Sequence, residues 1–260
     1  MSQKKTLIVS FCVLICLNSF MFAMAREPGM VKNKIKVYYA TIHIYTDLQS
    51  NEDASKAKPN VEKAVQYLES KIGYVNYYER IKFKVVDHGR TWDTSDVPTR
   101  RTAIGMPYHK RTDKWDMIHD LTGDMYRAGL DHGTKDGSVV IGFTTGLYKC
   151  NGIANTDSTP YGCLVSYKPS GKYIDFGIQI DWPNHRDDIL TLHELAHELG
   201  QLREGDNGHV DEDMSIDGVF HACSMDYSDL ANQYYGLCSS CRNAIVEQAV
   251  NNWEHEYMYI

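Results

Sequence analysis

The stretch DWPNHRDDILTLHELAHELGQLREG, residues 181–205, contains the pattern that decides the fold. Four apolar residues recur at the spacing of one helix face: Ile189, Leu192, Ala196 and Leu199. Asn184 can cap the helix N-terminus, and Asp187 and Asp188 suit the positive end of the helix dipole. Gly200 stands where such a helix must turn sharply. The stretch therefore predicts an amphipathic helix packed on a core.

Two histidines and a glutamate on this helix predict a metal site. His193 and His197 are four residues apart, so their side chains lie one turn apart on the same face. Two imidazoles so placed can chelate one zinc ion, and Glu194 projects beside them. Zinc with three protein ligands keeps a fourth position for water and lowers the pKa of that water to about 7. We expect Glu194 to be the general base that takes the proton and passes it to a leaving amine.

The rest of the chain alternates between strand and helix patterns. β-Branched, aromatic or alternating residues predict strands at residues 35–45, 81–85, 138–143 and 173–181. Two segments read as irregular chain, residues 88–111 and 144–172. Strands that alternate with helices predict one α/β domain with a largely parallel sheet and helices packed on it.

Three further helices follow from apolar stripes at helical spacing. Asn60 can cap the first, Thr112 opens the second, and the third covers residues 243–253. Their stripes are Val61, Ala64, Val65, Leu68 and Ile72; Trp115, Ile118, Leu121, Met125 and Ala128; and Ile245, Ala249 and Trp253.

Residues 1–25 predict a signal peptide. Two lysines precede a long apolar run, and Ala-Met-Ala at residues 23–25 supplies the small-x-small site for cleavage before Arg26. We therefore expect an exported protein, secreted or periplasmic, whose mature part is residues 26–260.

The mature chain is acidic. The whole sequence has 27 basic and 34 acidic side chains, and loss of the two signal-peptide lysines leaves a net charge of about −9. Such a charge gives no general attraction to nucleic acid or to an anionic membrane. We expect neither partner after the signal peptide is cleaved, and no feature indicates an oligomeric state.

Five of the seven cysteines lie in the mature chain: Cys150, Cys163, Cys223, Cys238 and Cys241. Export favours disulfides, and an odd number leaves at least one cysteine free, metal-bound or joined to another chain. A disulfide between Cys150 and Cys163 would pin the predicted loop at residues 144–172. The CxxC of residues 238–241, with Cys223 and with His221 nearby, could bind zinc, or Cys223 could form a disulfide with one of the pair.

In the helix at residues 193–200 and the turn at residues 223–227, the sequence resembles the metzincin clan of zinc metallopeptidases. Residues 193–200, HELAHELG, match the first eight positions of the clan pattern HExxHxxGxxH, and Cys223-Ser224-Met225-Asp226-Tyr227 resembles its methionine-containing turn. The resemblance implies that Met225 packs beneath the zinc and that Tyr227 binds the metal or steadies the tetrahedral intermediate. It also implies a two-lobed zincin domain with a mixed, mostly parallel sheet, an active-site helix and a C-terminal helix.

A narrower resemblance covers roughly residues 190–245. The C-x-M turn followed by LCSSC at residues 237–241 is similar to the second half of the archaemetzincin pattern. In that subfamily the cysteines bind a second, structural zinc, which here implies Cys223, Cys238 and Cys241 as ligands.

The sequence departs from the pattern at the third histidine. That position is Arg203, which stays protonated and cannot ligate zinc, and Glu204 stands where archaemetzincins have a cysteine. We expect the third ligand to be His209, which follows a Gly-Asp-Asn-Gly turn. His221, Asp206 and Glu204 are the alternatives.

These features together predict a secreted zinc endopeptidase that acts on polypeptides. In metzincins the strand before the active helix edges the cleft and binds substrate as an added strand, a role that the resemblance gives to residues 173–181. Two alternatives differ in function. One is a zincin-fold binding or inhibitory module with impaired catalysis, favoured by Arg203, and the other is a zinc amidase on non-protein amides.

Overall fold

The computed structural model describes residues 33–48, 56–97, 99–101, 110–112, 116–121, 137–144, 152–155, 162–166, 173–175, 178–180, 187–202, 213–216, 219–225 and 235–260. The expected signal peptide and its cleavage position lie outside these residues. Within them, no helix has the length and apolar character needed to cross a membrane.

A seven-stranded mixed sheet forms the centre of the fold. Its strands are β1 (Lys34–Thr46), β2 (Tyr74–Asn76), β3 (Glu79–Asp87), β6 (Ser138–Thr144), β7 (Gly152–Asn155), β8 (Gly162–Ser166) and β13 (His255–Tyr259). Their order is β2-β3-β1-β6-β8-β7, with β13 also paired to β1. The pairs β3-β1, β1-β6 and β6-β8 are parallel, whereas β2, β7 and β13 pair antiparallel. The predicted α/β fold with a mixed, mostly parallel sheet is confirmed.

Strand β1 is buried on one face and half-buried on the other over most of its length, and its sequence, KIKVYYATIHIYT, is rich in β-branched and aromatic residues. Successive side chains point to opposite faces of a strand. One face contributes Tyr38, Ala40, Ile42 and Ile44 to the main core. Tyr45, on the other face, belongs to a second, smaller core.

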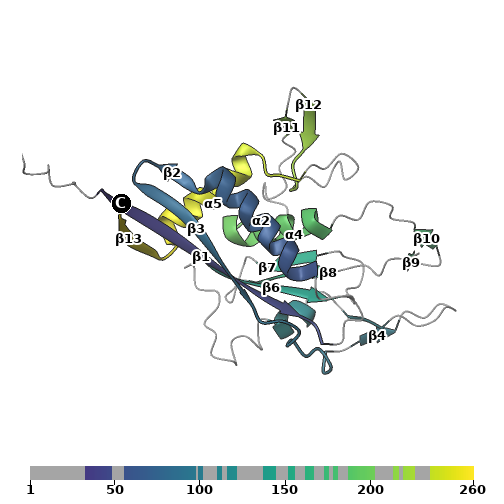
Figure 1. Ribbon diagram of the computed structural model, residues 1–260. Coiled ribbons are helices and arrows are strands. Elements are labelled where there is room, and N and C mark those ends of the chain that lie inside the picture. The colour runs from purple at the N-terminus through teal and green to yellow at the C-terminus, as the bar shows by residue number, and fades with distance from the viewer. Residues whose placement is uncertain are drawn as a thin grey trace, which may run out of the picture.

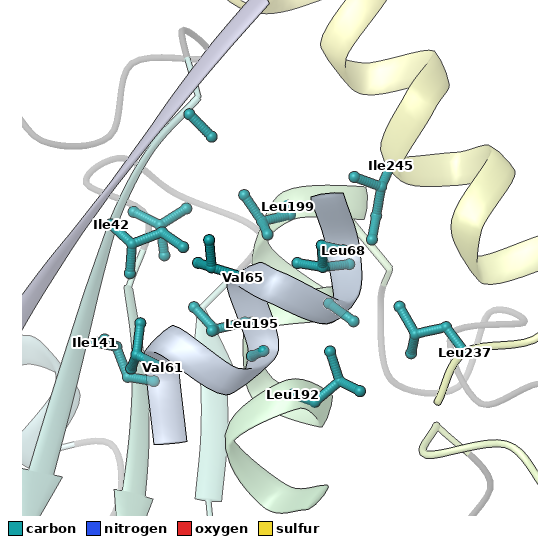
Figure 2. Close-up of a cluster of buried hydrophobic side chains, with 14 of the residues drawn as sticks. Ile42, Val61, Val65, Leu68, Ile141, Leu192, Leu195, Leu199, Leu237 and Ile245 are labelled. Atoms are coloured by element: carbon teal, nitrogen blue, oxygen red, sulfur yellow. The ribbon is translucent and has the colours of Figure 1, made fainter. Parts of the chain in front are cut away.

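Helices α2 (Ala57–Ile72) and α4 (Asp187–Gly200) lie over one face of the sheet (Figure 1). Helix α2 contacts β1 and β3, α4 contacts β6, β7 and β8, and the two helices contact each other. Figure 2 shows the side chains between these layers, namely Val61, Val65 and Leu68 of α2, Leu192, Leu195 and Leu199 of α4, and Ile42 and Ile141 of the sheet. Burial of each such side chain contributes about 1.5–3 kcal/mol, so this packing fixes the position of α4.

The apolar stripe of α2 is confirmed, but the helix starts earlier than expected. It begins at Ala57, so Asn60 lies inside it. Pro59 falls in the first turn, where backbone N–H groups have no acceptor within the helix, and proline is therefore tolerated.

The second core covers the other face of the sheet. It contains Tyr45, Trp92, Val97, Met117, Ile118, Leu121 and Val140. The indole Nε1 of Trp92 donates to Asp120 Oδ2 at 2.8 Å. Ile118 and Leu121 are buried as predicted, within a helical segment described at residues 116–121.

One expectation in this region is wrong and another is not tested. Thr112 is the last residue of strand β5 (Lys110–Thr112), and the start of the helix after it falls in residues 113–115, outside the described residues. Strand β5 pairs with β4 (Thr99–Arg101), so the segment 88–111 is not wholly irregular. Three-residue strands have too short a pattern to be recognised from local sequence. Trp115, Met125 and Ala128 lie outside the described residues.

The prediction that residues 144–172 form an irregular loop is also wrong, since strands β7 and β8 lie within this segment. These strands form through pairing with β6 and with each other, which local sequence does not reveal. Cys163 on β8 is a free, fully buried thiol, so the expected disulfide with Cys150 is contradicted. Cys150 itself lies outside the described residues.

The single strand predicted at residues 173–181 is divided in two. Strands β9 (Tyr173–Asp175) and β10 (Ile178–Ile180) pair antiparallel in a separate two-stranded sheet. The edge of the main sheet on the α4 side is β7, which contacts α4. The role of substrate-binding edge therefore does not fit residues 173–181.

The predicted C-terminal helix is confirmed as α5 (Ser239–Asn252), which begins four residues earlier than expected. Ile245 and Ala249 are fully buried, and Trp253 is the C-cap residue with 7% exposure. Helix α5 contacts α4, α2 and β1. It therefore carries its first turn, with Cys241, into the main core.

Candidate metal centre

Helix α4 buries its polar residues as well as its leucines. All of residues 191–200 are buried, and His193, Glu194 and His197 are each exposed by 3% or less. Buried polar side chains are costly unless they are hydrogen-bonded or bind an ion. The partners of these three side chains therefore reveal the chemistry of the site. Asn184, the expected N-cap, lies outside the described residues.

The two histidines of α4 face each other through the same ring atom. Nε2 of His193 and Nε2 of His197 are 3.1 Å apart, and the two rings are nearly perpendicular at 81°. Two nitrogens bound to one tetrahedral zinc at 2.0–2.1 Å are about 3.3 Å apart. The observed separation fits that geometry.

The opposite ring nitrogens fix the tautomers. Nδ1 of His193 lies 2.7 Å from the backbone oxygen of Ser224, and Nδ1 of His197 contacts the backbone oxygen of Leu202. A carbonyl oxygen only accepts, so each Nδ1 carries the proton and donates it. In the neutral rings both Nε2 atoms then have lone pairs, and these lone pairs point at each other. A cation between them removes the repulsion, and this arrangement of the second nitrogen is usual for metal-bound histidine.

The carbonyl that orients His197 is positioned by the end of α4. Leu202 N–H donates to the carbonyl of His197 at 2.9 Å, and Gln201 N–H donates to the carbonyl of Glu198 at 3.4 Å. Gln201 has φ of +51°, the left-handed conformation of a Schellman motif. The sharp turn is thus at Gln201 and not at the expected Gly200.

Gly200 serves close packing instead. A Cβ atom at this position would lie 3.1 Å from Leu202 Cγ and 3.2 Å from Ile245 Cγ1. The absence of a side chain lets α5 and the turn approach the end of α4.

The predicted methionine turn lies against α4. Cys223, Ser224 and Met225 are all fully buried, and Cys223 and Met225 belong to the main core together with Leu192 and Leu195. The bond from His193 Nδ1 to Ser224 joins this turn to the histidine pair. The turn therefore supplies both apolar packing and a hydrogen-bond acceptor next to the candidate site.

Three cysteines form a second cluster, the cysteine triad. Cys223, Cys238 and Cys241 are buried, and their sulfurs lie within 4.8 Å of one another, so they could hold a metal ion such as zinc. The sulfurs of Cys238 and Cys241 are 3.4 Å apart. Tetrahedral zinc with bonds of 2.3 Å separates two sulfurs by about 3.8 Å. All three are free thiols, so the alternative of a disulfide from Cys223 is contradicted.

The surroundings of Cys223 favour its thiolate form. The backbone N–H of Cys238 lies 3.1 Å from Cys223 Sγ, and that of Met225 lies 3.5 Å away. Hydrogen bonds from the neighbouring thiols of Cys238 and Cys241, with these N–H groups, hold the pKa of Cys223 below its ordinary value. Cys241, in the first turn of α5, has its pKa raised instead, chiefly through its hydrogen bonds with Cys223 and Cys238.

Cys163 differs from the triad. Burial is the main cause that raises the pKa of its thiol, and the carboxylates of Glu198 and Glu194 add to that effect. This cysteine therefore stays a thiol, whereas Cys223 is suited to metal binding.

The other predicted site residues are not placed. His209, Asp206, Glu204, Arg203 and Tyr227 lie outside the described residues. His221 belongs to strand β12 (Val219–Ala222), which pairs with β11 (Asp213–Ile216), and its side chain is not described. The third ligand of the histidine pair therefore stays a prediction.

Two residues of the site were missed by sequence reasoning. Ser224 and Leu202 act through backbone carbonyls, so their side-chain types carry no signal of that role. Only their positions, next to Met225 and just after the helix end, could have indicated them.

The sequence matches no protein-family model, and no curated protein is significantly similar to it.

Proposed function

We propose that the protein is an exported zinc-dependent endopeptidase of the metzincin type. One observation carries the proposal. Nε2 of His193 and Nε2 of His197 lie 3.1 Å apart while both Nδ1 atoms face backbone carbonyls, an arrangement suited to a shared cation. The described fold is compatible with that function, because α4 is held firmly between the sheet, α2 and α5.

The chemistry divides between the metal and Glu194. When bound, zinc supplies an acidified water and polarises the substrate carbonyl. Glu194, next to His193 on α4 and 1% exposed, accepts the proton of the attacking water and donates it to the leaving amine. A buried carboxylate in this position is not needed for metal binding alone, so it favours catalysis over a purely structural zinc.

The remaining roles follow from the metzincin resemblance. His209 is the proposed third ligand, with His221, Asp206 and Glu204 as alternatives, and Tyr227 steadies the tetrahedral intermediate. Zinc at the cysteine triad is a second, structural ion. Its three ligands are Cys223, Cys238 and Cys241, whose burial and spacing fit it.

A polypeptide substrate is supported by the position of β7. This strand ends the main sheet and contacts α4. An edge strand offers unpaired backbone groups, to which an extended peptide can add as a further strand beside the histidine pair. Export through the proposed signal peptide at residues 1–25 would place the enzyme outside the cytoplasm, as a secreted or periplasmic protein.

A second candidate is a zincin-fold binding or inhibitory module without catalysis. Arg203, at the position where the metzincin pattern has its third histidine, favours it. A zinc amidase with non-protein substrates is the third possibility that the same experiment separates.

The test is hydrolysis of unfolded protein by the zinc-loaded wild type and by Glu194→Ala. We expect the variant to keep its zinc and to lose activity by about 10²–10⁴-fold, the usual contribution of a general base. Glu198→Gln is the matched control, since Glu198 is also buried on α4, and it should retain activity within about tenfold of the wild type. A zinc-loaded wild type that cleaves no polypeptide would disprove the peptidase, and cleavage of small amides instead would favour the amidase.

A further inference from the structure

Ser224 lies between the histidine pair and the cysteine triad. Its carbonyl accepts the bond from His193 Nδ1 at 2.7 Å, and the preceding residue, Cys223, supplies one sulfur of the triad. Ser224 is fully buried, so this link is shielded from solvent. A shift of Ser224 would therefore change the geometry of both the histidine pair and the cysteine triad.

A closed set of hydrogen bonds holds Ser224 in place. Its N–H donates to the carbonyl of Gly236 at 2.7 Å, and the N–H of Gly236 donates to the Ser224 hydroxyl at 2.9 Å. Two residues later, the N–H of Cys238 donates to Cys223 Sγ at 3.1 Å. Residues 223–225 and 236–238 are thus joined twice through Ser224 and twice through the sulfur of Cys223, which also lies 3.8 Å from the carbonyl oxygen of Gly236.

Helix α2 anchors the same segment from the other side. The hydroxyl of Tyr67 accepts the N–H of Leu237 at 2.7 Å and donates to the carbonyl of Leu237 at 3.3 Å. The segment 236–238 is therefore fixed to the core, whereas its link to Cys223 depends on the state of the sulfur. A thiolate bound to a metal keeps that link, and the ion adds two more, through Cys238 and Cys241.

We propose that a divalent metal ion in the cysteine triad sets the metal affinity of the histidine pair, with Ser224 as the positioning residue between them. The proposal rests on the proposed function of the histidine pair as a zinc site. Three sulfurs drawn to one ion hold residues 223–225 against the start of α5, and the carbonyl of Ser224 then stays on His193 Nδ1. That bond keeps the lone pair of His193 Nε2 directed at the shared metal position. The two metal affinities are then coupled, and the coupling is reciprocal.

Cobalt titration of the metal-depleted full chain tests the coupling. Co²⁺ bound to thiolates gives a charge-transfer absorption that nitrogen ligands do not, so the two sites are measured separately. In the double variant Cys238→Ala/Cys241→Ala, the thiolate band should vanish. The affinity of the histidine pair for Co²⁺ should then fall about 10–100-fold, the usual effect of a lost supporting contact. Far-UV circular dichroism verifies that the variant is folded.

Ser224→Ala keeps the test decisive if the double variant does not fold. It removes the hydroxyl that accepts the Gly236 N–H. We expect about tenfold weaker binding at the histidine pair once the triad is filled, with less than about threefold change at the triad while the histidine pair is empty. The matched control is Thr144→Val, which removes a buried hydroxyl that donates to Asp47 Oδ2 at 2.8 Å outside this network. It should change neither affinity, which separates positioning from general destabilisation.

Unchanged affinity of the histidine pair in a folded protein with an empty triad would overturn the proposal, as would equal effects of Ser224→Ala and Thr144→Val. Because the readout is metal affinity, a wild type that binds two metal ions but cleaves nothing would disprove the peptidase and leave the coupling intact. An active enzyme whose two sites bind independently would do the reverse.

Discussion

Two histidine pairs have almost the same nitrogen separation but different chemistry. His43 on β1 and His88 just after β3 approach to 3.0 Å between Nδ1 and Nε2, and their rings are stacked at 20°. His193 and His197 approach to 3.1 Å between their Nε2 atoms, with rings at 81°. In the first pair one ring can donate to the other, so a single hydrogen bond accounts for the contact. In the second pair, both Nδ1 protons are already donated to carbonyls.

The nitrogen separation alone therefore does not indicate a shared metal ion. The partner on the far side of each ring is more informative, because it decides where the proton lies. The carbonyls of Ser224 and Leu202 leave two lone pairs facing each other, whereas a mixed Nδ1–Nε2 contact can be satisfied by one proton. The comparison therefore makes different predictions for the two pairs.

The largest expected effect is loss of the metal from α4. His197→Ala should reduce the bound zinc by one equivalent and lower hydrolysis by at least about 10³-fold, since a Lewis acid contributes several kcal/mol to the transition state. His43→Ala is the matched control and should keep both the zinc and the activity. Mass spectrometry measures the bound zinc, and cleavage of unfolded protein measures the activity. Equal zinc loss in both variants would abolish the distinction between the pairs.

The sequence could predict only one of these pairs. His193 and His197 are neighbours because helical geometry places residues i and i+4 on one face. His43 and His88 are neighbours because β1 and β3 pair in parallel with His43 opposite Val86. That register depends on tertiary packing, so the 45-residue separation in sequence gives no sign of it.

The next largest effect is on folding stability, and it distinguishes two kinds of buried cysteine. As with the histidine pairs, the groups that contact each side chain decide its chemistry. Cys223 receives two backbone N–H groups and lies near two sulfurs, whereas Cys163 has its pKa raised, chiefly by burial. We expect Cys223→Ala to cost at least about 3 kcal/mol of unfolding free energy, because a bound structural metal stabilises only the folded chain. Cys163→Ala should cost about 1 kcal/mol, the scale of a small lost core group. Urea unfolding measures both.

A chelator provides the control for this prediction. It should lower the stability of the wild type and of Cys163→Ala by more than that of Cys223→Ala, from which only the zinc of the histidine pair can still be removed. Equal sensitivity of all three proteins to chelation would contradict a metal at the triad.

The cysteines also show where sequence reasoning ends. The CxxC at residues 238–241 and the turn at Cys223 were sufficient to group the three sulfurs. Export and the loop expected around Cys163 favour a disulfide at this cysteine. The strand that contains it forms only by pairing with β6, and on that strand its side chain enters the core. Tertiary pairing thus overrode the local pattern.

A smaller effect on folding stability is expected from the stacked pair, His43 and His88, as the pH falls. Burial lowers the pKa of His88 below its ordinary value of about 6.5, although the nearby Asp87 carboxylate opposes this. The unfolded chain then takes up the proton at higher pH than the folded chain does. Folding stability should therefore decline as the pH falls through about 6.5. The slope of the unfolding free energy against pH should correspond to the uptake of less than one proton.

His88→Gln tests this assignment by urea unfolding at several pH values. Removal of the histidine should flatten the decline below pH 6.5 relative to the wild type. The exposed His255, changed to Gln, is the control and should leave the decline nearly as it is. A steeper decline in His88→Gln would mean that protonated His88 is stabilised by the fold, contrary to its burial against Tyr45, whose ring stacks on it at 4.2 Å.

The helix of the site was predicted well, but its end was not. Ile189, Leu192, Ala196 and Leu199 are all buried as the periodicity predicted. Glycine is the usual residue in a left-handed helix end, so Gly200 was the natural choice for the turn. The chain instead continues the helix through Gly200, because the missing Cβ makes room for Ile245, and it turns at Gln201.

The smallest expected effect tests that turn. Gln201→Gly removes the cost of about 1 kcal/mol for a side chain in the left-handed region. It also loses the bond from Gln201 Nε2 to the carbonyl of Glu198 at 2.9 Å and makes the unfolded chain more flexible. These terms nearly cancel, so the unfolding free energy should change by no more than about 0.5 kcal/mol. The zinc affinity of the histidine pair should be unchanged, since Leu202 keeps its place.

Gln201→Val makes the test two-sided. A β-branched residue fits the left-handed region poorly, so the turn should lose about 1–2 kcal/mol. The carbonyl of Leu202 should then move from His197 Nδ1, and zinc affinity should fall together with stability. The pair His43 and His88 has no such dependence on the end of α4. If Gln201→Val lowered stability but left zinc affinity unchanged, the carbonyl of Leu202 would not be what orients His197, and the proposed difference between the two pairs would rest on Ser224 alone.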